Sequence, residues 1–260
     1  MTPDHPTAGA GALSQQSWDV IVVGGGVIGS AIAHFLAAEP AFPGSILVVE
    51  RDPSYAKSST ALSAGSIRQQ FSTEENINIS KFGYEFLNAI DEHLTGGDEV
   101  PDIGLVKAGY LFLATDHGIG ILRENHAVQR RCGAEVALMS PDALRDRFPW
   151  LKADDLAGGS LGLGGEGWFD PFAHLQAFRR SAVALGAVYV EDEVIGFARA
   201  DDRITGVILG ERGSVACGTC VNAAGPSAAT LAAMAGIELP VRPRKRLVFY
   251  FQCPDPIADA

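Results

Sequence analysis

Asp19-Val-Ile-Val-Val-Gly24-Gly25-Gly26-Val-Ile-Gly29 is the most informative stretch of the sequence. Residues 20–23 form a short, wholly apolar run rich in β-branched side chains, which is typical of a parallel strand buried on both faces. Three consecutive glycines follow and predict a tight turn. The residues from this turn to Ala38 predict a helix, so we expect a strand, a turn and a helix at the start of the fold.

The glycines at positions 24, 26 and 29 have the spacing that binds the pyrophosphate of a dinucleotide. Gly24 makes the tight turn, Gly26 lets the backbone approach the phosphates, and Gly29 lets the helix pack closely on its strand. The amides and the dipole at the helix N-terminus favour an anion there. Residues 45–50 predict a second parallel strand, and Glu50 at its end is placed to accept hydrogen bonds from the adenosine ribose. A glycine-rich turn that binds nothing is the alternative.

Composition excludes several classes of protein. Residues 20–38 contain no Asp, Glu, Lys or Arg, but three glycines in mid-span and a strand-like first half argue against a membrane helix. The hydrophobic fraction of 47% and the charged fraction of 20% are those of an ordinary globular protein. A net charge of -11 argues against nucleic acid or an anionic membrane surface as a partner.

The four cysteines, Cys132, Cys217, Cys220 and Cys253, do not look like a disulfide framework and indicate a reducing compartment, so we predict a cytoplasmic protein. Residues 1–16 resemble neither a secretory signal nor a mitochondrial presequence and are expected to be a disordered tail. Cys217 and Cys220 form a C-x-x-C motif. Residues three apart on a strand point to opposite faces, and no second Cys or His pair lies nearby, so no metal site is predicted.

The middle of the chain departs from strict alternation of strand and helix. Residues 51–71 are rich in hydroxyl and small side chains that can contact a polar ligand, a solvated loop being the alternative. Ser72 or Thr73 is expected to cap a helix over residues 74–94 that ends at Gly96-Gly97.

Residues 105–114 predict two strands joined or bent near Gly109, and residues 119–131 predict a helix. Ser140-Pro141-Asp142 is typical of another helix start. Because these elements break the alternation, we assign residues 100–156 to an inserted second domain.

Gly158-x-Ser160-x-Gly162 has the spacing of a hydrolase nucleophile elbow. That motif needs a helix directly after the serine. Residues 161–165 are a poor helix start, so a hydrolase is disfavoured.

The second half returns to the opening design. Asp170 and Pro171 predict the start of a helix that ends near Leu185. Four strands are then expected, over residues 187–191, 194–198, 204–209 and 215–221. The last strand leads into Asn222-Ala-Ala-Gly-Pro226 and a helix to about Ala235. This repeat of strand, turn and helix predicts that a second backbone edge approaches the same ligand.

Together these motifs resemble the D-amino-acid oxidase superfamily of FAD-dependent oxidoreductases, and within it the sarcosine oxidase and dimethylglycine dehydrogenase branch. The resemblance rests on the first glycine turn, Val48-Val-Glu-Arg-Asp52, Ser63-Ala-Gly-Ser-Ile-Arg-Gln-Gln-Phe71, Gly167-Trp-Phe-Asp-Pro171 and Val221-Asn-Ala-Ala-Gly-Pro226. The subgroup called FAD-dependent oxidoreductase domain-containing protein 1 is similar through residues 69–76, 139–142, 166–171 and 243–246. The resemblance extends from Asp19 to Pro254.

The resemblance implies an α/β fold with a Rossmann-type, glutathione-reductase-like FAD-binding domain and an inserted mixed α+β substrate domain, C-terminally incomplete. The FAD-binding domain would comprise residues 17–99 and 157–238. The substrate domain would begin with residues 100–156, and residues 239–260 would start the segment that returns to it.

The resemblance also implies FAD rather than NAD as the cofactor, bound covalently or noncovalently. Glu50 would bind the ribose, Val194 would meet the adenine through its backbone, and Arg68 would lie near the flavin ring as a fixed cation that stabilises negative charge. A surface salt bridge is the alternative for Arg68. The other implied cofactor-binding residues are Gly24, Gly26, Val27, Ile28, Gly29, Arg51, Ser58, Ser59, Ser63, Ala64, Gly65, Ala224 and Gly225.

The implied activity is oxidation of a C–N bond in an amino acid or N-methylated amine, such as sarcosine or dimethylglycine, by hydride transfer to the flavin. Relatives continue well past the position of Ala260, and that part would supply most of the substrate pocket, so an oxidase and a dehydrogenase both stay open, as does the electron acceptor. Pro226 is followed by Ser227, where relatives carry a small residue and then tryptophan. An NAD(P)-binding dehydrogenase, for which Arg51 leaves room, and an inactive flavin-binding scaffold or assembly factor are the alternatives.

Overall fold

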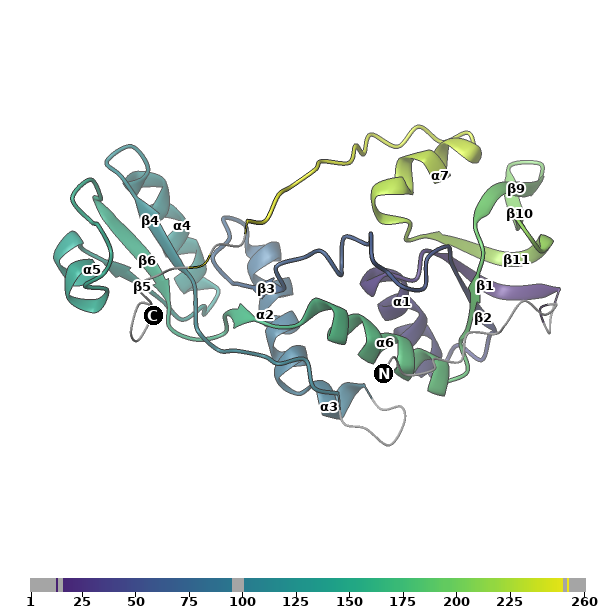
Figure 1. Ribbon diagram of the computed structural model, residues 1–260, viewed down its shortest axis with the longest axis horizontal. Helices are drawn as coiled ribbons and strands as arrows, with labels where there is room; N and C mark the ends of the chain where they lie inside the picture. Colours follow the sequence, from purple (N-terminus) through teal and green to yellow (C-terminus); the bar gives the residue numbers. More distant parts are fainter. Residues whose placement is uncertain (1–12, 14–15, 95–100, 250–251, 253–260) are drawn as a thin grey trace. The chain divides into compact units, whose positions relative to one another are not determined.

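The computed structural model describes residues 13, 16–94, 101–249 and 252 (Figure 1). They form two compact units. The first unit comprises the residues up to Ser63, Leu94–Asp102 and Pro171–Arg246, and the second comprises Ala64–His93, Ile103–Asp170 and the residues from Leu247 onward.

The first unit is built on a six-stranded sheet with the order β8-β2-β1-β11-β10-β9. Its strands are β1 (Ser17–Val23), β2 (Ile46–Glu50), β8 (Val188–Glu191), β9 (Val194–Ala200), β10 (Arg203–Leu209) and β11 (Gly213–Asn222). β8, β2, β1 and β11 are parallel, whereas β10 is antiparallel to β11 and to β9. β2 and β8 lie on one side of β1, and β11 pairs with the other side of β1. The strand order therefore reverses between β1 and β11, the place where α/β sheets of this kind bind ligands.

Both faces of the central strands are buried, which explains the continuous apolar run in β1. The helices of this unit are α1 (Val27–Ala38), α6 (Pro171–Ala184) and α7 (Ala228–Met234), with one turn of 3-10 helix, η1 (Gly225–Ser227), before α7. Val22 packs in one cluster with Ala33 of α1 and Ala182 of α6. Ile21 packs in a second cluster with Leu231 of α7. The α/β fold predicted from the sequence is confirmed.

The second unit contains a three-stranded antiparallel sheet with the order β4-β6-β5 and a two-stranded pair, β3 and β7. Its elements are β3 (Ser66–Ile67), α2 (Glu74–Asn88), α3 (Ile90–His93), β4 (Leu111–Ala114), α4 (Ile119–Arg131), β5 (Val136–Met139), α5 (Pro141–Arg147), β6 (Gly158–Gly162) and β7 (Gly167–Trp168). Ile77 of α2 packs with Val128 of α4 and Val136 of β5. Ser140 caps α5 as predicted, because its Oγ accepts a hydrogen bond from the backbone N–H of Ala143 at 3.2 Å.

The helix predicted over residues 74–94 is interrupted. It ends at Asn88, Ala89 has a non-helical ψ of 35°, and α3 begins at Ile90. Beyond the interruption, the ring of His93 stacks on Phe86 with their centroids 4.7 Å apart. Gly96 and Gly97, where the helix was expected to end, lie outside the described residues.

The prediction of two strands over residues 105–114 is wrong for the first of them. Only β4 forms, and Val106 makes an isolated bridge to Trp168. Gly109 has a φ of +76°, and a Cβ there would lie 2.3 Å from the carbonyl oxygen of Gly162. The chain therefore turns at Gly109, in a place that only glycine fits.

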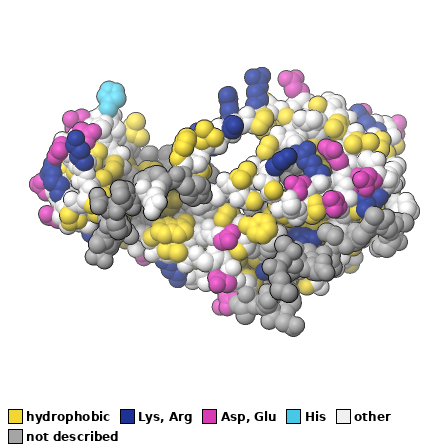
Figure 2. Space-filling view, in the orientation of Figure 1, with side chains coloured by type: hydrophobic (Ala, Val, Ile, Leu, Met, Phe, Trp, Pro, Cys, Tyr) yellow, Lys and Arg dark blue, Asp and Glu magenta, His cyan; other side chains and the backbone are white. Residues whose placement is uncertain are grey.

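The compact units divide the chain at other residues than the predicted domain borders. Ala64–His93 joins the second unit because α2 packs on α4. Residues 157–170 join it because β6 pairs with β4 and β5, and β7 pairs with β3. The functional assignment of the domains stays a prediction. Within the described ranges, none of the helices has the length and apolar character that a membrane crossing requires. Figure 2 shows Lys and Arg side chains interspersed with Asp and Glu side chains on the face in view.

Candidate dinucleotide-binding site

A cavity of about 720 Å³ opens in the first unit where β1, β2 and β11 end. Its walls are the glycine turn after β1, the start of α1, the loop after β2, the turn between β8 and β9, and the segment that leads through η1 into α7. The cavity thus lies where the strand order reverses, and its volume is within the usual range for small-molecule sites.

The three glycines of the motif have different reasons for lacking a side chain. Gly24 has a φ of +102°, and a Cβ there would lie 2.4 Å from the carbonyl oxygen of Ala223. A Cβ on Gly29 would lie 1.8 Å from the carbonyl oxygen of Gly24, so this glycine lets α1 pack on the turn. At Gly26 the nearest protein atom would be Thr60 Oγ1 at 3.6 Å. The protein leaves this space open, and a phosphate needs room there.

The N-terminus of α1 faces this space. Gly26 is the N-cap residue and has no side chain to cap the helix, and the first turn holds no acidic residue. The backbone N–H of Val27 donates to Thr60 Oγ1 at 3.3 Å, and Val27 and Ile28 line the cavity. The positive end of the helix dipole is therefore available to an anion.

Glu50 holds the glycine turn in place and also lines the cavity. Its Oε2 accepts a hydrogen bond from the N–H of Gly25 at 2.8 Å, and its Oε1 accepts one from the N–H of Asp52 at 2.9 Å. Ser30 Oγ donates to the carbonyl of Gly25 at 2.8 Å, so both backbone polar groups of Gly25 are fixed. Because each carboxylate oxygen can accept a second hydrogen bond, Glu50 can hold the turn and still bind a hydroxyl in the cavity that it lines.

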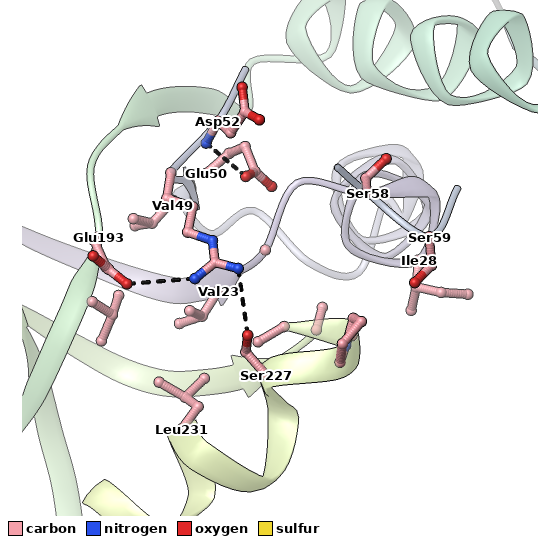
Figure 3. A pocket seen from close by; sticks show the side chains of 18 of the residues that line it. Val23, Ile28, Val49, Glu50, Asp52, Ser58, Ser59, Glu193, Ser227 and Leu231 are labelled. Atoms are coloured by element: carbon pink, nitrogen blue, oxygen red, sulfur yellow. Dashed lines mark hydrogen bonds and ion pairs between the residues drawn. The ribbon is translucent and has the colours of Figure 1, made fainter. Parts of the chain in front are cut away.

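Arg51 connects two walls of the cavity. Its guanidinium lies 3.6 Å from Glu193 Oε1 and donates to Ser227 Oγ at 3.5 Å, and Figure 3 shows Glu193 and Ser227 with these dashed contacts. The two charged side chains are 62% and 61% exposed, so the pair contributes little to stability. Ser58 and Ser59 lie near Ile28, away from Glu193 in the same view.

The turn between β8 and β9 is held by a buried ion pair. Asp192 Oδ2 accepts a hydrogen bond from Arg212 at 2.9 Å, and Oδ1 accepts from the N–H groups of Glu193 and Glu211 at 2.8 and 3.1 Å. Burial alone would raise the pKa of Asp192, but these hydrogen bonds and the charge of Arg212 bring it below its ordinary value of 3.8. The carboxylate therefore stays ionised at the rim of the cavity.

The structure brings most of the predicted cofactor-binding residues together. Those that line the cavity are Gly24, Gly26, Val27, Ile28, Glu50, Arg51, Ser58, Ser59, Val194, Ala224 and Gly225. Gly29 does not line it, and Ser63 follows in the loop beyond Thr60, whose carbonyl oxygen accepts its N–H. Ala64, Gly65 and Arg68 belong to the second unit. Their predicted roles stay predictions.

Sequence reasoning missed several residues of the cavity wall. They include Tyr55 and Lys57 from the loop after β2, Glu193 from the β8–β9 turn, and Thr230, Leu231 and Met234 from α7. The hydroxyl-rich composition of residues 51–71 pointed to the loop but not to Tyr55. The sequence around the α7 residues gives no indication of ligand binding, because only the packing of α7 brings them to the cavity.

Arg68 lies among aromatic rings of the second unit. Its guanidinium carbon is 4.9 Å from the ring centroid of Phe71 and 5.8 Å from that of Phe112. Its Nε is buried and has no hydrogen-bond partner among the described residues. The ion pairs found in that part of the chain do not include Arg68, so the alternative of a surface salt bridge is not supported.

Two alternative chemistries do not fit the structure. Ser160 lies in the middle of β6 with a buried hydroxyl, and no helix follows it, so there is no nucleophile elbow at this serine. Cys217 and Cys220 are free thiols, and Cys220 packs against the apolar cluster that contains Cys217, so the prediction that the two side chains point to opposite faces of the strand is wrong. Burial raises the pKa of Cys220 to about 12, which opposes thiolate chemistry. No cluster of metal-binding side chains was found among the described residues.

The fold and the cavity define a Rossmann-type dinucleotide-binding protein. Residues 19–260 match the family described as FAD dependent oxidoreductase, and the chain belongs to this family. The predictions of an oxidoreductase of this family and of FAD as its cofactor are confirmed.

Individual relatives agree with this assignment. The chain is 42% identical to FAD-dependent oxidoreductase domain-containing protein 1 of Xenopus laevis over 98% of its own length and 57% of that protein. It is 26% identical to sarcosine oxidase subunit beta of Arthrobacter sp, covering 93% of the chain and 60% of the relative. Among solved structures, L-proline dehydrogenase from P. horikoshii is similar with a TM-score of 0.74 and 30% identity, over 86% of this chain and 57% of that one. The chain thus spans somewhat more than half the length of these relatives.

The residues of the cavity fit the adenosine diphosphate part of FAD. The open space at Gly26 and the N-terminus of α1, whose first turn holds no acidic residue, suit a diphosphate, and the carboxylate of Glu50 suits a ribose. Apolar side chains such as Val194, Leu231 and Met234 complete the wall.

Proposed function

We propose that this chain is the FAD-binding part of an enzyme that oxidises a C–N bond in an amino acid or N-methylated amine. The observation that carries the proposal is the space at Gly26, left open between the ends of β1 and β11 although the protein could accommodate a side chain there. The names of two similar proteins, a sarcosine oxidase subunit and a proline dehydrogenase, support this class of substrate.

Different residues of the chain would bind different parts of FAD. The turn at Gly24 and Gly26 and the start of α1 bind the diphosphate, Glu50 binds the ribose, and Val194 meets the adenine. Bound FAD supplies the hydride-accepting chemistry. Arg68 holds a positive charge beside the rings of Phe71 and Phe112, with its Nε buried, and a fixed cation there can stabilise negative charge on the reduced flavin. We also propose that the protein is located in the cytoplasm, on the basis of its few cysteines.

Reconstitution tests the cofactor. The chain is expected to retain a yellow flavin after incubation with FAD and gel filtration, with a flavin absorbance spectrum in the protein peak. Isothermal titration with NADH is expected to give no binding. Binding of NADH without any retained flavin would contradict the proposal.

Turnover tests the substrate class. The longest available form of the protein, loaded with FAD, is expected to reduce a redox dye with sarcosine, dimethylglycine or proline. Replacing Arg68 with methionine is expected to lower the rate at least tenfold, because the cation acts where negative charge develops. Retained FAD with no turnover on any amine or amino acid would reject the oxidation and favour an inactive scaffold.

A further inference from the structure

Tyr55 has an unusual backbone conformation in the wall of the cavity. Its φ of +55° makes it one of two non-glycine residues with a positive φ in the part of the chain that the structure describes. Its N–H donates to the carbonyl of Asp52, and its carbonyl accepts from the N–H of Ser58, both at 2.9 Å. A bulky aromatic residue is unfavourable in this region of backbone space, and such strain gathers at functional sites.

The hydroxyl of Tyr55 lies against the glycine turn. A Cβ built on Gly25 would be 3.2 Å from this hydroxyl and 3.1 Å from the Cβ of Glu50. The phenol thus lies against Gly25, whose N–H is held by Glu50 and whose carbonyl is held by Ser30. Tyr55 and Glu50, the residue placed to bind the ribose, therefore both border the same glycine.

The same hydroxyl lacks a hydrogen bond. It is buried, the residue is 2% exposed, and the described part of the chain offers it no partner. An unpartnered buried hydroxyl is costly and needs an explanation in a native protein. Burial raises the pKa of Tyr55, with Arg179 opposing and Glu50 reinforcing the shift, so the phenol keeps the proton that it can donate.

We propose that Tyr55 is a positioning residue of the ribose subsite, whose hydroxyl donates to the Glu50 carboxylate once one ribose hydroxyl is bound there. The inference rests on the proposed FAD site. It explains why two costs, a strained backbone and an unpartnered hydroxyl, occur together in one residue of the cavity wall. The ligand-bound state supplies the hydrogen bond that the free chain lacks.

Titration of the full chain with ADP and with 2′,3′-dideoxy-ADP, which lacks both ribose hydroxyls, tests the proposal. Tyr55→Phe is expected to weaken ADP binding by about 10- to 100-fold, the range for one lost hydrogen bond to a charged group, and to leave dideoxy-ADP binding unchanged. Tyr189→Phe is the matched control, because Tyr189 is a buried tyrosine of β8 that does not line the cavity. It is expected to bind both nucleotides as the original chain does.

Thermal unfolding separates positioning from simple packing. The Tm of ligand-free Tyr55→Phe is expected to be unchanged or higher, because an unpartnered hydroxyl is removed while the ring stays. Equal losses for both nucleotides together with a lower Tm, or an unchanged affinity for ADP, would overturn the inference. Failure of the original chain to bind either FAD or ADP would overturn the proposed function as well, whereas normal binding of both by Tyr55→Phe overturns only the role of Tyr55.

Discussion

Gly26 and Gly29 belong to one motif, but the packing of the protein requires a glycine only at position 29. A side chain at Gly29 would collide with the backbone of Gly24, whereas a side chain at Gly26 would enter the cavity. Replacing each with alanine therefore separates folding from binding.

Gly26→Ala is expected to keep the fold and to lose the ligand. The φ of -60° at Gly26 suits any residue, so the Tm should stay within about 2 °C of the original, while FAD affinity should fall at least tenfold because the Cβ occupies the phosphate space. Gly29→Ala is the control and should cost about 2 kcal/mol of stability by overpacking. Calorimetry and flavin titration measure both. An unchanged FAD affinity in Gly26→Ala would contradict the assignment of this space.

At the scale of residues, sequence reasoning reached what a local pattern encodes. The spacing of Gly24, Gly26 and Gly29 and the position of Glu50 follow from a rule that links backbone shape to a phosphate. Tyr55 could not be found in this way, because a left-handed tyrosine contradicts its own backbone preference and depends on Asp52 and Ser58 to hold it.

Among the elements, the meander of β9, β10 and β11 depends on one ion pair. Asp192 follows β8, and Arg212 lies in the turn between β10 and β11, so their contact ties two turns of the same sheet. The side chain of Asp192 is 1% exposed and accepts three hydrogen bonds.

Asp192→Asn is expected to destabilise the ligand-free chain by about 3 kcal/mol at pH 7, because it removes the buried charge that pairs with Arg212 and leaves only the exposed Glu211 at 3.9 Å. The pKa of Asp192 is lower in the folded chain than in the unfolded chain, so its carboxylate stabilises the fold above pH 3.8. This contribution is lost as the pH falls through the folded pKa. Urea unfolding between pH 7 and pH 3 should show the two proteins converging at low pH, and a difference that grows towards acid would contradict the argument.

The sequence predicted most elements because their patterns are local. The apolar run of β1, the Ser140-Pro141 start of α5 and the strands from β8 to β11 all formed where they were expected. The interruption at Ala89 and the loss of a strand before Gly109 were not predictable. The turn at Gly109 depends on its close approach to Gly162, which is distant in sequence. The interruption at Ala89 is accompanied by the stacking of His93 on Phe86.

On the scale of the whole molecule, each unit has buried apolar clusters drawn from its own described residues. Glu166 organises the second one: it is 1% exposed, and its carboxylate accepts hydrogen bonds from the N–H of Gln69 at 2.7 Å, the N–H of Tyr110 at 3.1 Å and the side chain of Gln70 at 3.0 Å. A Cβ on Gly162 would lie 1.8 Å from Glu166 Oε2, so the chain makes room for this carboxylate.

Glu166→Leu is expected to destabilise the second unit by about 3 kcal/mol or more, because it leaves several buried donors without an acceptor. ADP affinity should stay within twofold of the original, because every residue that lines the cavity belongs to the first unit. Glu135→Gln, at an exposed position, is the control and should change neither quantity. Thermal unfolding and ADP titration provide the measurements. Loss of ADP binding in Glu166→Leu under conditions where the first unit stays folded would contradict this separation.

The fold class was predictable for the whole chain because the repeated design of strand, glycine turn and helix has one common solution. The borders of the units were not, because α2 could pack with either set of elements by composition alone. Its partner is fixed by Ile77, whose neighbours Val128 and Val136 lie far along the chain.

The pairing of β1 with β11 has a consequence for biosynthesis. Ser17 pairs with Ala216 and Val23 with Asn222, so one edge of β1 is covered only after about two hundred further residues have been made. During translation that edge is open to wrong partners, including the same strand of a neighbouring nascent chain. A nucleotide therefore has a complete site only once α7, which carries Met234 of the cavity wall, has been made.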